Sequence, residues 1–137
     1  MPREYIWVQT GIPPKCKLQK WHKDACVAKA ERFIAEFYRP KFIKPPPKDP
    51  KWNYVTDFRA AFSGSYLRFH VKYACPSPRA LSPSFEVPFA RLGCFDRDRW
   101  NLWARRHNDQ WMCLERAPVP LDECFDAMRA NPWFHFE

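Results

Sequence analysis

The sequence predicts an α+β domain in which an N-terminal helix precedes, and a short C-terminal helix follows, a curved antiparallel sheet of about five strands. Three observations predict it. The 137 residues are 46% hydrophobic, which is enough for one domain with a packed core. Apolar residues change from helical spacing to alternation after a proline-rich stretch, and they change back near the C-terminus. Fifteen prolines and three glycines divide the chain into short elements.

The first fifty residues are predicted to hold one helix between two irregular segments. Residues 1–21 show little periodicity and are expected to form an irregular, basic lead-in to a single domain over residues 22–137. A helix is predicted over residues 22–38, and Pro40 is expected to end it, because the residue before a proline is disfavoured in the α conformation. A stiff proline-rich spacer follows over residues 40–51. The apolar side of this helix has the spacing i, i+1, i+4, i+7, i+8, i+11 and consists of Cys26, Val27, Ala30, Phe33, Ile34 and Phe37.

Five strands are predicted to follow as a meander. Strict alternation indicates strands over residues 54–62 and 66–75, and Gly64 lies in the turn between them. A third strand over 85–95 is disturbed near its start by Pro88, and polar turns separate it from strands over 99–105 and 110–115. The last helix begins at Leu121 and stops at Asn131 and Pro132. Both helices are expected to cover one face of the sheet.

The charge of the chain is strongly uneven. The whole sequence has a formal net charge of +8, and residues 1–51 alone hold twelve basic and five acidic side chains, a balance of +7. Such a surface favours attraction to a polyanion such as nucleic acid, although a solvated basic surface without a ligand is the alternative.

The cysteines do not indicate a metal site. The six cysteines lack a C-x-x-C pair, and the nearest approach to ligand spacing is Cys16, His22 and Cys26. Since Cys26 falls on the apolar side of the predicted helix, it is expected in the core, and we predict no metal and no cofactor. Without a secretory or membrane-spanning apolar run, the thiols are expected to stay reduced, the protein to be cytoplasmic, and a membrane not to be among its partners.

Cationic residues alternate along two of the predicted strands. If both sets project from one side of the sheet, they form a cationic surface with an aromatic platform. A base stacked on Trp103 would contribute about 1 to 3 kcal/mol. The alternative is that Trp103 is covered and the arginines pair with nearby aspartates. The residues expected to contact nucleic acid are Arg68, His70, Lys72, Arg99, Trp103 and Arg105.

Two further functions remain open. A metal-independent ribonuclease needs a proton shuttle and a cation, for which His70, His107 and Arg106 are the candidates, although the absence of known catalytic motifs favours a non-catalytic protein. The other function is a protein-interaction module, because an aromatic tail either packs on its own domain or docks on a partner or a second copy. The tail contains Trp133, Phe134 and Phe136.

The C-terminal half carries a resemblance to a known family. Its residues are the stretch Val87 to Arg91, the segment Trp100 to Trp111 enclosing Arg106 and Asp109, then Glu115 and Pro118, and the helix from Leu121 with its aromatic tail. This pattern resembles a family of small uncharacterised bacterial proteins catalogued as a domain of unknown function, over residues 26–137. The sequence departs from the pattern in the positions of Trp103 and Asp109 and in having Leu114 where a tyrosine is expected. The resemblance implies the same α+β fold and no mechanism.

Overall fold

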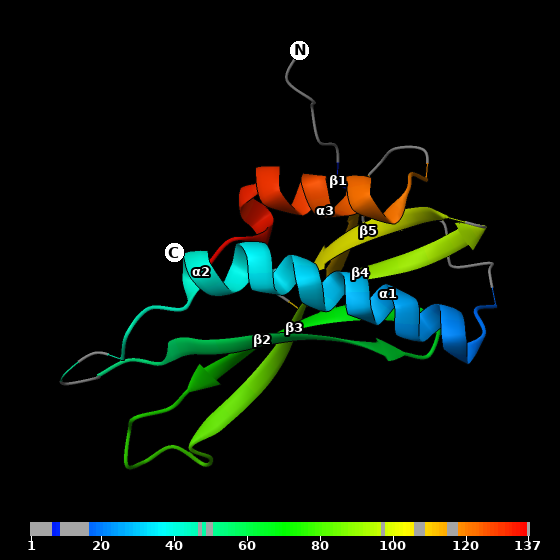
Figure 1. Cartoon of the computed structure of the whole chain (residues 1–137). Helices are drawn as coiled ribbons and strands as arrows, with labels where there is room; N and C mark the ends of the chain where they lie inside the picture. Colours follow the sequence, from blue (N-terminus) through cyan, green and yellow to red (C-terminus); the bar gives the residue numbers. More distant parts are fainter. Residues whose placement is uncertain are drawn as a thin grey trace.

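The chain folds into one antiparallel sheet with its helices on one side (Figure 1). The structure is a computed structural model that describes residues 7–8, 17–46, 48, 51–96, 98–105, 109–114 and 118–136. Two long strands, β2 (Tyr54–Ser63) and β3 (Tyr66–Ala74), are followed by the longest, β4 (Ser84–Asp96), and then by β5 (Arg99–Arg105) and β6 (Trp111–Leu114). These five strands form the predicted meander.

The lead-in contributes a sixth strand. The two residues of β1 (Trp7–Val8) pair antiparallel with β6, so the order across the sheet is β1-β6-β5-β4-β3-β2. The expectation of an entirely irregular lead-in is therefore wrong at this point. Two residues are too few to show an alternation of apolar and polar side chains, so strand β1 cannot be recognised from the sequence. It is evident only from its pairing with β6, more than a hundred residues away.

The N-terminal helix continues through Pro40. It consists of α1 (Lys20–Phe33), a π-helical turn (Ile34–Tyr38) and α2 (Arg39–Phe42), in which Pro40 is an early residue. A proline inside a helix lacks an N–H and crowds the carbonyl four residues back. Here the backbone N–H of Arg39 donates to the carbonyl of Ile34 five residues back, so the wider turn accommodates the ring. The expectation that Pro40 ends the helix is wrong for this reason.

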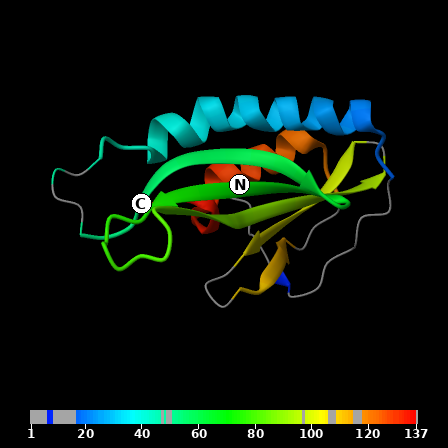
Figure 2. The same cartoon turned by 90° about the horizontal axis from the view of Figure 1, so that it is seen from below.

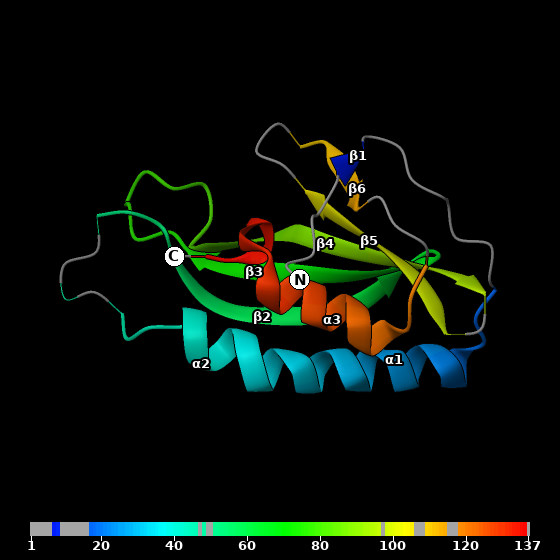
Figure 3. The ribbon, with the colours of Figure 1, turned by 90° about the horizontal axis from the view of Figure 1, so that it is seen from above.

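Both long helices lie on the same face of the sheet (Figure 3). The C-terminal helix α3 (Leu121–Ala130) lies beside α1 (Figure 3), and the apolar sides of the two helices meet buried side chains of β2, β3, β4 and β5. Rings dominate this core: Phe33 stacks on Phe125 at 4.7 Å between ring centres, and Phe69 lies 6.1 Å from Phe33. Cys26 is 4% exposed, as predicted for the apolar side of the helix.

The aromatic tail packs back on the domain. A short 3-10 turn (Pro132–Phe134) places Phe134 in the core with no exposed surface, and Phe136 contacts Phe89 at 4.8 Å between ring centres. Trp133 is partly buried against the same core. The tail therefore completes the domain core.

The sheet has a second face, which we call the far face because it is turned away from α1 and α3 (Figure 2). Cross-strand partners share a face, so the register identifies its residues. Arg68 on β3 pairs with Arg91 on β4, which pairs with Trp103 on β5. The next partner across the sheet is Cys113 on β6.

Candidate functional site

The register brings together part of the predicted cationic surface. His70 and Lys72 follow Arg68 at intervals of two on β3, so all three lie on the far face, with Trp103 two strands away. On the neighbouring strands, Arg59 pairs with His70 in register and Arg91 with Arg68. We call these five residues the cationic patch: Arg59, Arg68, His70, Lys72 and Arg91.

A β-bulge puts Arg91 in the patch. Simple alternation from Phe85 through Val87 and Phe89 would place Arg91 on the helix-covered face. The register of β4 against β3 shifts between the partners Phe69 and His70, and consecutive Phe89 and Ala90 are both buried. A bulge places an extra residue opposite one partner and re-aims the side chains beyond it. The sequence signal was present, since apolar residues change parity at this point, from 85, 87 and 89 to 90, 92 and 94.

Arg91 occupies the space over Trp103. Its guanidinium carbon lies 5.2 Å from the ring centre of Trp103, 4.3 Å from that of Tyr66 and 4.7 Å from that of Trp111. Tyr66 also meets Trp103 edge-on at 5.5 Å. Trp103 is consequently only 2% exposed. The expectation of an open indole platform is wrong, because the bulge delivers a long cation onto that ring.

Arg68 and Arg91 are adjacent cations without a carboxylate. None of the ion pairs between described residues includes either side chain. The Nε atom of each is buried and has no hydrogen-bond partner. Burial lowers the pKa of Arg91, and the charge of Arg68 lowers it further.

The rest of the patch is partly neutralised. Arg59 forms an ion pair with Glu86 of β4. Burial lowers the pKa of His70 from its ordinary value, and Arg59 and Arg68 lower it further while Glu86 opposes them. Lys72 is exposed, and none of the ion pairs between described residues includes it. The cross-strand neighbours of Lys72 are, however, the carboxylates Asp57 and Glu86. The charge without a neighbouring carboxylate in register is therefore concentrated on Arg68 and Arg91.

The other predicted arginines lie at opposite ends of β5 and are ion-paired. Arg99 binds Asp96 across the β4–β5 turn, with its Nε 2.6 Å from Oδ1. Arg105 is 2.7 Å from a carboxylate oxygen of Asp109. These pairs match the alternative in which arginines are held by nearby aspartates. The ribonuclease candidates Arg106 and His107 lie outside the described residues.

The thiols form no metal centre within the described part of the chain, where no three His, Cys, Asp or Glu residues gather. Cys16 lies outside that part. Cys113 is 3% exposed beneath Arg91, and burial raises the pKa of its thiol to about 11 although Arg91 opposes the shift. It is a buried structural thiol rather than a nucleophile at neutral pH.

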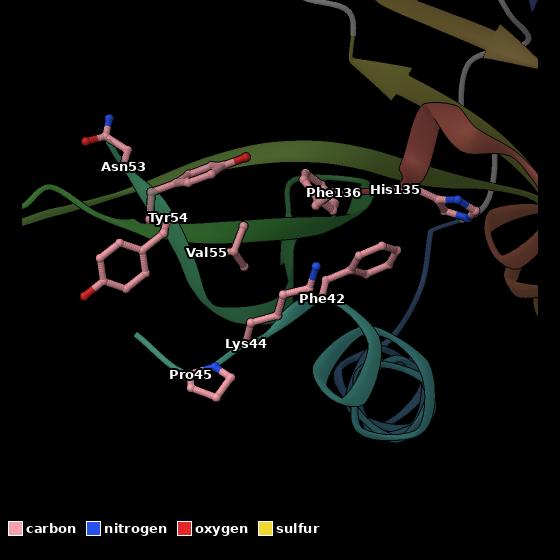
Figure 4. Close-up of a pocket in the computed structure, with 9 residues that line it drawn as sticks. Phe42, Lys44, Pro45, Asn53, Tyr54, Val55, His135 and Phe136 are labelled. Carbon is pink, nitrogen blue, oxygen red and sulfur yellow. The ribbon is translucent and has the colours of Figure 1, made fainter. Parts of the chain in front are cut away.

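A cavity at the end of α2 is separate from the patch. It has about 600 Å³ and lies where α2 ends over the start of β2 (Figure 4). Its apolar walls come from Phe42, Val55 and Phe136, and the Lys44 side chain points between Phe42 and Val55. His135 turns away from these residues, and its Nε2 is 3.0 Å from the carbonyl oxygen of Arg129, so the imidazole fastens the tail to α3.

The comparisons with known proteins identify a family and no function. Residues 18–136 match the model of a family described as a domain of unknown function, DUF3024. No curated protein and no solved structure matches the chain. No helix within the described ranges is long and apolar enough to cross a membrane. Because the family match spans most of the 137 residues, the chain belongs to the DUF3024 family.

Proposed function

We propose that the chain is a non-catalytic binding module that contacts the phosphates of nucleic acid through the cationic patch. The observation that carries the proposal is the adjacent pair Arg68 and Arg91, which no ion pair between described residues includes, with Lys72 exposed on the same sheet face. Phosphate contacts supply most of the affinity of sequence-independent binding.

The rest of the molecule supports long-range attraction. The formal net charge is +8, so a polyanion is drawn to the surface before any specific contact forms. Exposed lysines and an arginine also line the polar side of α1, at Lys20, Lys29 and Arg32. We further infer a cytoplasmic location, where free thiols such as Cys26 and Cys75 stay reduced.

A salt titration tests this function. Fluorescence anisotropy of a labelled mixed-sequence single-stranded RNA should show binding at about 50 mM salt that weakens linearly in log–log form as salt rises. Each phosphate contact adds about 0.7 to the slope for a single strand, so Arg68→Ala/Lys72→Ala should flatten it by about 1.4.

The matched control removes the same charge from paired residues. Arg99→Ala/Arg129→Ala deletes two arginines that are held by Asp96 and Asp126, and it should leave the slope within error of the parent protein. A control that flattens the slope equally would reduce the effect to net charge and overturn the assignment to the patch. No binding of RNA or DNA at low salt would overturn the function itself.

A further inference from the structure

Arg68 and Arg91 stand opposite each other on neighbouring strands. Residues in direct register across an antiparallel pair have Cβ atoms about 4.5–5.5 Å apart, and like charges placed there are destabilising. Among the described residues, the nearby carboxylates of Glu86 and Asp57 are bound by Arg59 and Arg39. The pair is therefore in a repulsive arrangement that this part of the molecule does not relieve.

Both guanidinium groups also leave a donor unused. Their Nε atoms are buried and lack a hydrogen-bond partner. A buried donor without a partner is destabilising, and such groups are few in folded proteins. Two such donors, on adjacent residues of like charge, leave this pair unsatisfied by the described part of the chain.

The aromatic rings around Arg91 hold it in place despite the repulsion. Tyr66, Trp103 and Trp111 contact the guanidinium at 4.3–5.2 Å from their ring centres, and attraction between a cation and a ring face is favourable even where water is excluded. A guanidinium held by rings loses less conformational freedom when it binds an anion. The rings therefore preorganise the Arg91 guanidinium for binding an anion.

We propose that Arg68 and Arg91 form a binding site for one phosphate group between β3 and β4. Such an oxyanion accepts hydrogen bonds from the terminal nitrogens of each guanidinium and relieves the repulsion between the two cations. This inference deepens the proposed function, because the bound phosphate would belong to the nucleic acid backbone. Free phosphate shares the same chemistry, and the experiment separates the two sources.

The experiment uses inorganic phosphate and the full chain. In a ¹⁵N NMR titration, the Arg68 and Arg91 Nε–H signals should shift with a common saturating curve, whereas chloride at equal ionic strength should not shift them. Arg68→Gln should weaken phosphate binding at least tenfold. Arg129→Gln, which removes a cation outside the patch that is paired with Asp126 on α3, should change it less than threefold.

Stability in chloride buffer distinguishes a binding pair from a structural one. If Arg68 and Arg91 serve to bind an anion rather than to stabilise the fold, Arg68→Gln relieves the repulsion between them. The melting temperature of this variant should then equal that of the parent protein or exceed it. A lower melting temperature, or phosphate shifts that do not saturate or persist in Arg68→Gln, would overturn the site. RNA binding that survives Arg68→Gln with an unchanged salt slope would overturn the site while leaving the proposed function. Phosphate binding without RNA binding would support the site but overturn the proposal that the bound phosphate belongs to nucleic acid.

Discussion

Arg91 covers Trp103: the guanidinium carbon lies 5.2 Å from the ring centre, and the indole is 2% exposed. The two residues are direct partners on β4 and β5. Because Arg91 covers it, the Trp103 indole is buried and cannot serve as a stacking platform for a base. The outer group at this position is the Arg91 guanidinium rather than the Trp103 ring.

Removal of this cover should expose the indole. In Arg91→Ala, the indole N–H of Trp103 should exchange with solvent at least about tenfold faster, which corresponds to about 1.4 kcal/mol of lost protection. NMR hydrogen exchange measures it, with Trp103→Phe to assign the signal. Arg99→Ala, which removes a cation from the same strand, should leave the rate unchanged. An unchanged rate in Arg91→Ala would show that other groups cover the ring.

The hydroxyl of Tyr38 should be dispensable. Tyr38 is fully buried in the π-helical turn, its hydroxyl has no hydrogen-bond partner, and burial raises its pKa well above the ordinary value. Tyr38→Phe keeps the ring contacts and removes an unsatisfied polar group, so the free energy of unfolding should be unchanged or higher by about 1 kcal/mol. Urea denaturation measures it. A loss of more than about 1 kcal/mol would mean that the hydroxyl has a partner after all.

Glu31 should fasten α1 to the outer edge of β2. Its carboxylate accepts the backbone N–H of Ala60 at 2.9 Å and lies 3.5 Å from Arg39, whose Nη2 also donates to the carbonyl of Phe58 at 3.2 Å. Glu31→Ala leaves that N–H without an acceptor and should cost about 1 to 3 kcal/mol of unfolding free energy, whereas Glu31→Gln retains an acceptor and should cost less. Glu36→Ala, at an exposed position two residues beyond Ile34, should change stability by less than about 0.5 kcal/mol. Equal effects at the two glutamates would contradict the assignment.

His70 should make the protein less stable in mild acid. Its folded pKa is lowered from 6.5 by burial and by Arg59 and Arg68, so the unfolded chain takes up the proton first as the pH falls. The free energy of unfolding should therefore decrease as the pH falls through 6.5 and level off once the pH is below the folded pKa. His70→Gln should remove this slope, whereas His22→Gln, on α1, should retain it. Denaturant titrations between neutral pH and mild acid measure it, and identical slopes in all three proteins would refute the prediction.

The local spacing of residues was sufficient for the elements themselves. Alternation from Leu67 to Tyr73 predicted β3 and placed Arg68, His70 and Lys72 on one side of it, and the strand over residues 99–105 has the predicted bounds. The apolar spacing from Cys26 to Phe37 predicted the helix that covers the sheet. Backbone periodicity depends on neighbours a few residues away, which a single sequence contains.

Three features were decided by tertiary structure. Helical geometry continues through Pro40 because a wider turn precedes it, and that turn places Tyr38 among rings of the sheet. Arg91 reaches the far face because a bulge in β4 depends on pairing with β3. Trp103 is buried because Tyr66 and Arg91 reach it from other strands. The sequence by itself thus determined helices, strands and the alternation of side chains along them, whereas the sheet determined which side chains meet, since contacts across strands depend on register rather than on local spacing.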